Sequence, residues 1–253
     1  MKASLPMYDL PALRAAHTRY WSLIREQLLE VGIKATASLN ANGVGLDFWT
    51  APDLILSQTC GMPYRRHLHG KVQIIGTPDY GVAGCAPGYY NSVLIKRRND
   101  PRNTLARFNG ARAAINEYGS QSGFAALAEA SRQADTLFAE VIVTGAHAAS
   151  VRAVADGSAD IAAIDAVTWA LLSTYEAAGE FVTVFESTAP TPGLPYICSK
   201  QIDRQLVFDA VDSAMEALAP ADRETLMLRE LVFIPSEAYT AVPSPAPDAL
   251  IKP

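Results

Sequence analysis

Short apolar runs alternate with longer segments of helical period along this chain. The runs of four to six residues are typical of buried strands, and the segments between them repeat their apolar residues with helical spacing. This alternation constrains the fold most, because it predicts an α/β protein with largely parallel sheets. The expected strands are residues 3–8, 36–40, 54–58, 72–76, 92–96, 112–116, 140–145, 160–165, 181–186 and 194–198. The expected helices are residues 10–32, 122–133, 148–158, 166–179 and 204–218, and Gly32, Gly157 and Gly179 are expected left-handed caps at helix ends.

Length and charge exclude several classes of function. A chain of 253 residues, 49% of them hydrophobic, can bury a large core or build two lobes. Its net charge is −5 and its longest basic run is residues 96–98, which argues against binding to nucleic acid. No apolar stretch is long enough for a membrane span. The start of the chain lacks the apolar centre of a secretory signal, so we expect a cytoplasmic or an already processed protein.

Cofactor and metal motifs are not evident. Cys60, Cys85 and Cys198 lack zinc spacing; a Cys60–Cys85 disulfide is conceivable, although free thiols are the commoner case. His67 and His69 form an H-x-H pair without a neighbouring acid, which favours surface histidines over metal ligands. Neither a phosphate-binding loop nor a G-x-S-x-G nucleophile elbow occurs. We therefore expect no cofactor and no metal.

Polar residues follow several predicted strands where helices begin. Ser120 and Ser122 lie in the segment GSQSG, His147 follows the strand 140–145, and Asp165 ends the strand 160–165. Each has two interpretations. The side chains could cap the following helices, or they could face a ligand, since the carboxyl ends of strands in open α/β sheets line the ligand crevice. In the second case the backbone N–H groups of residues 120–123 would remain available to an anion.

Taken together, several blocks resemble the phosphonate/phosphate family of ABC-transporter substrate-binding proteins, whose fold is the two-lobed type II periplasmic binding protein. The blocks are LILSQTCGMPY, GTPDYGVAGCAPGYYNSVLI, GARAAINEYGSQSGFAAL, TGAHAASVRAVADGSADIAAIDAVTW and TAPTPGLPYI, in the family's order. The resemblance implies lobe one at residues 1–93 and 188–253, lobe two at residues 94–187, and a ligand between them. Each lobe is expected to hold a mostly parallel sheet flanked by helices, with two crossovers.

The resemblance also implies which residues bind the ligand. In the family, a Ser-x-Ser-Gly turn at a helix start holds the phosphonate oxygens; Gln121 replaces the usual Thr here, which puts one hydroxyl contact in doubt. Tyr8 is expected on the first strand, and Tyr89 is the alternative to Tyr90. The implied ligand-binding residues are Tyr8, Ser57, Gln58, Thr59, Tyr90, Ser120, Gln121, Ser122, His147 and Asp165.

One departure from the pattern of the family bears on the charge of the ligand. Aminophosphonate binders that resemble this chain carry a second acid near the returning crossover, whereas residues 187–195 contain none. Asp165 would be the sole acidic partner of an amino group, which disfavours aminoalkylphosphonates.

The functional prediction is a solute-binding protein that captures a small oxyanion such as phosphonate, phosphate or phosphite for ABC-type uptake. It would be periplasmic if the chain is a processed form, with an ABC permease as partner and without enzymatic activity. The alternative is a cytoplasmic sensor or an enzyme on the same two-lobed fold, for which His147 and Asp165 are the candidate acid–base pair.

Overall fold

The computed structural model describes residues 1–252, apart from the side chains at 177 and 178. The chain divides into two compact units. Unit 1 holds residues 1–89 and 192–242, and unit 2 holds residues 90–191 and 243–252. The chain therefore passes between the units at three points. None of the described helices combines the length and the hydrophobicity that a membrane crossing requires.

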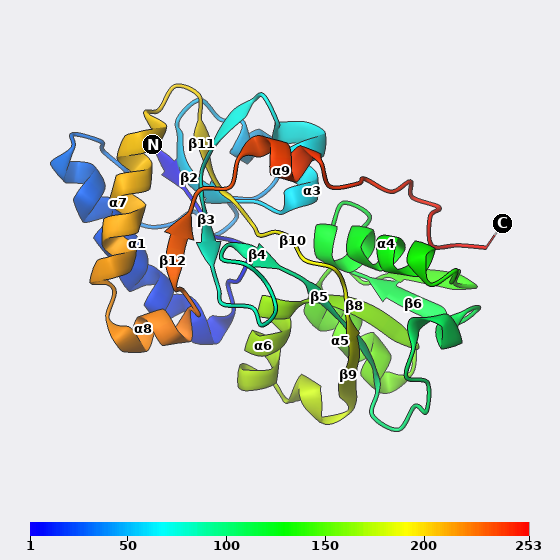
Figure 1. Cartoon of the computed structure of the whole chain (residues 1–253). Coiled ribbons are helices and arrows are strands. Elements are labelled where there is room, and N and C mark those ends of the chain that lie inside the picture. The colour runs from blue at the N-terminus through cyan, green and yellow to red at the C-terminus, as the bar shows by residue number, and fades with distance from the viewer. Residues whose placement is uncertain (253) are drawn as a thin grey trace. The chain divides into compact units, whose positions relative to one another are not determined.

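Unit 1 is built on a five-stranded sheet of order β1-β2-β11-β3-β12 (Figure 1). Its strands are β1 (Lys2–Ala3), β2 (Leu54–Gln58), β3 (Val72–Asp79), β11 (Tyr196–Ser199) and β12 (Glu230–Val232). Its helical segments are η1 (Pro11–Leu13), α1 (Arg14–Glu30), α2 (Leu46–Trp49), α3 (Gly61–Pro63), η2 (Tyr64–Leu68), α7 (Arg204–Ala217), α8 (Pro220–Thr225) and α9 (Ser236–Thr240).

Helix α1 forms and docks because its apolar residues recur on one face. Tyr20, Ile24 and Leu28 follow one another at four-residue spacing and are all fully buried. Helix α1 packs against α7, which in turn contacts β3 and β12. Helix α7 thus lies between α1 and the β3–β12 end of the sheet.

Unit 2 has its own five-stranded sheet, of order β7-β6-β8-β5-β9. The strands are β5 (Ser92–Arg97), β6 (Arg112–Ile115), β7 (Glu140–Val143), β8 (Ile161–Asp165) and β9 (Val182–Ser187). The helical segments are η3 (Leu105–Phe108), η4 (Gln121–Ala125), α4 (Ala126–Gln133), α5 (His147–Asp156), α6 (Ala166–Tyr175) and η5 (Ala177–Glu180). Strand β8 is buried along its whole length, and α4, α5 and α6 all contact it.

Strand direction is mixed in both sheets, because strands that run antiparallel to their neighbours lie among the parallel ones. Strands β6, β7 and β8 run parallel, but β5 is antiparallel to both of its neighbours. Strand β11 is likewise antiparallel to β2 and β3. Strands β5 and β11 are each the first full strand after the chain passes from one unit to the other, so no helical crossover from a neighbouring strand fixes their direction. Strand β12 also runs antiparallel to its neighbour β3.

Several smaller details of the predicted strands and helix ends differ in the structure. Residues 36–40 form no strand, β1 is only two residues long, and the sequence did not predict β12. The short strands β4 (Tyr89–Tyr90) and β10 (Thr191–Pro192) pair with each other at the passages between the units. Gly32 and Gly157 have the expected positive φ, whereas Gly179 lies inside η5, after α6 has ended at Tyr175.

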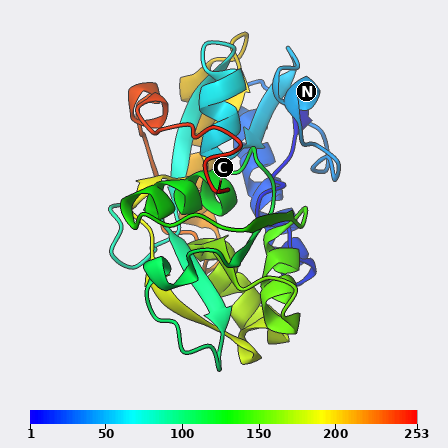
Figure 2. The same ribbon diagram turned by 90° about the vertical axis from the view of Figure 1, so that its right-hand side faces the viewer.

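The C-terminal tail belongs to unit 2, although the sequence assigned residues 243–253 to lobe one. The N–H of Phe138 donates to Leu250 O over 2.8 Å, the N–H of Lys252 donates to Phe138 O over 3.2 Å, and Ile251 forms a parallel bridge with Phe138. Leu250 is fully buried. In both views the red end of the tail lies next to α4 (Figure 1 and Figure 2).

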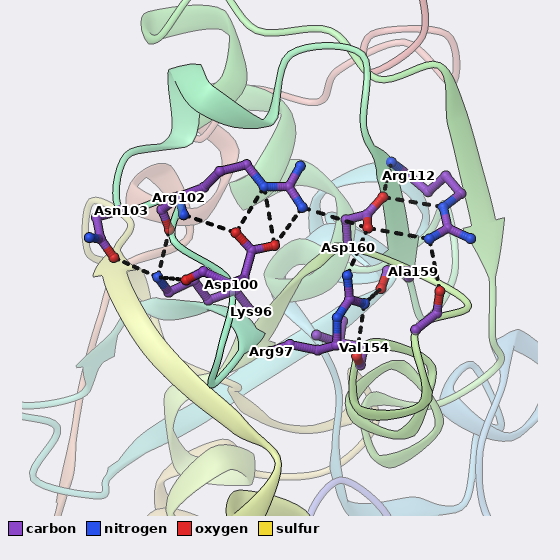
Figure 3. A network of polar contacts seen from close by, with 10 residues as sticks. Lys96, Arg97, Asp100, Arg102, Asn103, Arg112, Val154, Ala159 and Asp160 are labelled. Atoms are coloured by element: carbon purple, nitrogen blue, oxygen red, sulfur yellow. Dashed lines mark hydrogen bonds and ion pairs between the residues drawn. The ribbon is translucent and has the colours of Figure 1, made fainter.

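A network of charged side chains joins the strands and loops of unit 2 (Figure 3). Asp160 accepts hydrogen bonds from Arg97 and Arg112, and Arg102 lies 3.6 Å from the same carboxylate while pairing with Asp100. Burial raises the pKa of Asp160, but hydrogen bonds from Arg112 and Arg97 outweigh it and lower the pKa to about 2. The carboxylate thus ties β5, β6 and the start of β8 together.

We predict that Asp160→Asn destabilises unit 2 by about 2 kcal/mol or more at neutral pH, because it leaves three guanidinium groups without their shared anion. Since the folded pKa lies below the ordinary value, this stabilisation is complete above pH ~4 and is lost as the pH falls toward ~2. Urea unfolding as a function of pH measures both effects. Asp248→Asn, at an exposed tail position, is the control; equal loss in the two variants would contradict the prediction.

Candidate functional site

Three strand-to-helix junctions of unit 2 meet at one edge of its sheet. Strands β6, β7 and β8 are parallel neighbours, so their carboxyl ends share that edge. The segment after β6 carries Ser120 and Ser122, α5 begins at His147 directly after the β7 turn, and β8 ends in Asp165. The sequence predicted this grouping from strand ends alone.

Ser120 is the N-cap of the helix that begins with η4 and continues as α4. Its hydroxyl oxygen accepts from the Gly123 N–H over 2.9 Å, and its own N–H donates to Glu117 O over 3.2 Å. The expectation that all N–H groups of residues 120–123 stay available is therefore wrong for Ser120 and Gly123. Within the part of the chain that the structure describes, the N–H of Ser122 has no hydrogen-bond partner.

The side chains of Ser122 and His147 contact each other directly. Ser122 Oγ lies 2.8 Å from His147 Nε2. Burial lowers the pKa of His147 to about 4, so the imidazole is neutral at physiological pH. The residue as a whole keeps some solvent exposure, but its Nδ1 atom is buried and forms no hydrogen bond with any described residue.

Ser92 and Asn116 belong to this site, and the sequence analysis missed both. Ser92 is almost fully buried, pairs with Asp165 in the sheet and donates its hydroxyl proton to the carbonyl oxygen of Ser122 over 2.9 Å. Asn116 follows β6, and its Oδ1 atom is buried without a hydrogen-bond partner among residues 1–252. Position was the only signal in the sequence: Ser92 begins a predicted strand and Asn116 ends one.

Asp165 and the two remaining candidates of unit 2 are buried. Asp165 Oδ1 accepts from the Thr168 N–H over 2.9 Å and so caps α6, which was the alternative interpretation of this residue. Gln121 is the first residue of η4, and Tyr90 lies on β4. Tyr89, the alternative to Tyr90, packs against the apolar cluster of unit 1 that contains Trp49.

The candidates of unit 1 divide into two groups. Ser57 is fully buried, 2.8 Å from the Ser4 hydroxyl, and accepts from Trp49 Nε1 over 3.1 Å; the Thr59 N–H donates to Pro195 O. Both residues are thus held inside unit 1.

Tyr8 and Gln58 instead line a common cavity of about 10 Å³ in unit 1. Gln58 Nε2 donates to the Tyr80 hydroxyl over 3.0 Å, and the Tyr8 and Tyr80 rings meet edge to face. Tyr8 lies in a turn beyond β1, not on the first strand as predicted.

The chemistry of this edge favours binding over catalysis. A Ser–His contact also occurs in nucleophilic enzymes, but there a third group holds Nδ1 of the histidine. His147 Nδ1 has no such partner among the described residues, and Asp165 is committed to Thr168. Over residues 1–252 no group of three or more His, Cys, Asp or Glu side chains is arranged to hold a metal, and the three cysteines form no disulfide among these residues.

Residues 56–241 match a protein-family model. The description of this family is 'ABC transporter, phosphonate, periplasmic substrate-binding protein'. The chain belongs to this family. It is therefore a substrate-binding protein of the ABC-transporter type, and the family is a periplasmic transport family, not an enzyme family. No curated protein matches the sequence.

Solved structures share the fold at low sequence identity. A protein from Xanthomonas citri, solved with chloride, has a TM-score of 0.73 and 12% identity, over 96% of this chain and 98% of that one. PhnD1 from Prochlorococcus marinus, in complex with methylphosphonate, has a TM-score of 0.72 and 15% identity over 94% of each chain. The periplasmic aliphatic sulphonate-binding protein SsuA from Escherichia coli has a TM-score of 0.60 and 16% identity, over 95% of this chain and 77% of that one. These likenesses establish the type II periplasmic binding protein fold.

Gly123 has a steric role that yields a test. A Cβ atom built there would overlap Asn116 Oδ1 and approach His147 Cε1 to 3.3 Å. We predict that Gly123→Ala costs about 1–3 kcal/mol of stability, because Asn116 or the helix start must move. Gly119→Ala is the matched control, since its nearest neighbours lie 3.9 Å away. Chemical unfolding of both variants measures the difference, and equal stability would show that the space is not needed.

Proposed function

We propose that this protein binds a small tetrahedral oxyanion of the phosphonate, phosphate or phosphite class at the start of the η4–α4 helix and presents it to an ABC permease. The proposal rests most on the N–H of Ser122, a helix-terminal donor that the described chain leaves without an acceptor. Family membership supports the class of solute, and the methylphosphonate complex of PhnD1 supports the chemistry.

Neutral donors supply the attraction in this proposal. Ser120 Oγ accepts a hydrogen bond from Gly123 but still carries a proton that it can donate to a ligand. Helix-terminal N–H groups and hydroxyls act within a few ångströms, so the overall charge of −5 does not oppose binding. The neutral His147 supports Ser122 without placing a charge in the site.

We propose different roles for the remaining candidate residues. Gln121 and Tyr90, both buried in unit 2, are proposed to contact the ligand or its substituent. Asp165, which is buried at the end of β8, is proposed to face the substituent of the ligand. In unit 1 we propose Tyr8 and Gln58 as ligand residues and assign Ser57 and Thr59 to the support of β2, because they are fully buried and bonded inside the unit.

Two measurements test this function. Phosphate, phosphite or methylphosphonate should raise the melting temperature, since a ligand at a hundred times its dissociation constant adds roughly 2.7 kcal/mol of stability. A response to unrelated metabolites and to none of these anions would disprove the oxyanion assignment.

Ser122→Ala should weaken oxyanion affinity by about tenfold or more, because it removes a hydroxyl from a buried anion site. Isothermal titration of the purified variants measures the change. Ser173→Ala, at an exposed position on α6, is the control and should bind as the parent does. Unchanged affinity in Ser122→Ala would leave this serine a structural role only.

A further inference from the structure

One nitrogen of the His147 ring forms no hydrogen bond within the described chain. His147 Nδ1 is buried and has no partner among residues 1–252, whereas Nε2 lies 2.8 Å from Ser122 Oγ. Burial lowers the pKa of the imidazole to about 4, and no charged group of the described residues contributes to this shift. At near-neutral pH the ring is therefore neutral and carries one proton, on either of its two nitrogens.

The described residues fix neither tautomer of this neutral ring. The tautomer of a histidine is normally set by a second hydrogen bond, because an acceptor beside one nitrogen holds the proton there and a donor excludes it. No described group does this at His147 Nδ1, and the serine hydroxyl at Nε2 can either donate or accept. Both tautomers make the same contact with Ser122, and both leave Nδ1 unpaired, so both stay open.

The two tautomers give Ser122 opposite roles toward a ligand. With the proton on Nδ1, Ser122 Oγ donates its proton to Nε2 and can only accept from a ligand. With the proton on Nε2, the ring donates to Ser122 Oγ, and the hydroxyl proton is available to a ligand oxygen. The backbone N–H of Ser122 is a donor in both cases. Hydrogen bonds to an ionised partner are stronger than neutral ones, so the ligand decides which tautomer is populated.

We propose that His147 is a positioning residue that changes tautomer with the ligand, so that Ser122 binds both protonated and proton-free oxyanions. This proposal rests on the function proposed above and specifies its ligands as both ionisation states of a phosphonate. The methylphosphonate monoanion donates its P–OH proton to Ser122 Oγ, whereas the dianion accepts the Ser122 proton. The ring loses one proton and gains one, so its charge does not change. Neither ligand meets an unpaired group at Ser122, and neither is rejected.

The first test reads the tautomer by nitrogen-15 NMR of the full chain with labelled histidine, the His147 signal being assigned by its loss in His147→Gln. The ligand-free protein should show a mixture of both tautomers. Methylphosphonate should shift the ring toward Nδ1–H below the second ionisation of this ligand and toward Nε2–H above it. Methanesulfonate, which carries no proton at either pH, is the matched probe and should favour Nε2–H at both. A ring that keeps one tautomer with both forms of methylphosphonate would overturn the proposal.

The second test measures affinity by isothermal titration at the same two pH values. The parent should bind the monoanion and the dianion of methylphosphonate with affinities within about tenfold of each other, since neither loses a hydrogen bond at Ser122. His147→Gln should keep this tolerance, because the glutamine amide can present either its donor or its acceptor group. His147→Leu should weaken both forms by about tenfold, because the Ser122 hydroxyl loses its partner. His67→Leu, at an exposed position, is the matched control. A parent that binds only one ionisation state would overturn the proposal.

The outcomes separate this inference from the proposed function. If the parent binds none of these anions, the oxyanion function and this proposal both fail. If the anions bind without a change of tautomer, only this proposal fails. If the His147 variants do not fold, the two affinities of the parent still confirm or overturn the proposal.

Discussion

The hydrogen bond between Ser122 and His147 is the interaction on which the candidate site depends. It joins two helices that follow different strands, and it can form only because β6 and β7 are parallel neighbours whose ends lie at the same edge. The β8 junction adjoins them through the pairing of Ser92 with Asp165 and the hydrogen bond from Ser92 to Ser122. The sheet thus fixes the geometry, and the loops contribute only short connections. Such an arrangement holds its polar groups in place before a ligand arrives.

The side chains of Ser92, Ser122 and His147 that the structure places at this edge carry no positive charge. Ser122 and His147 are neutral, whereas four cationic side chains of unit 2 are engaged with Asp100, Asp160 and loop carbonyls in the network of Figure 3. A site of neutral donors discriminates by the number and direction of its hydrogen bonds, because it has no charge to attract every anion equally. Family membership and site chemistry therefore agree on a solute-binding role.

Much of the fold could be predicted from the sequence because strands and helices carry different apolar periods. Strands β2, β3, β5, β6, β8 and β9 and helices α1, α4, α5, α6 and α7 lie where the runs indicated. Strand direction could not be predicted in this way. A run of apolar residues looks the same in the sequence whether its strand pairs parallel or antiparallel with its neighbour, as β5 and β11 show. Strand β12 was missed because only its middle residue is buried. In the site, strand ends pointed to Ser122 and His147, but nothing local distinguishes Asn116 or Ser92, whose roles come from contacts distant in sequence.

The placement of Leu250 has a consequence for the ends of the chain. Unit 1 ends at residue 242, whereas unit 2 buries a leucine that lies beyond all of unit 1 in the sequence. A chain cut after residue 242 would therefore keep every strand of both five-stranded sheets, yet it would lose the apolar side chain that packs in unit 2 and the backbone hydrogen bonds to Phe138. Loss of a short terminal segment would thus act on unit 2 and leave unit 1 complete.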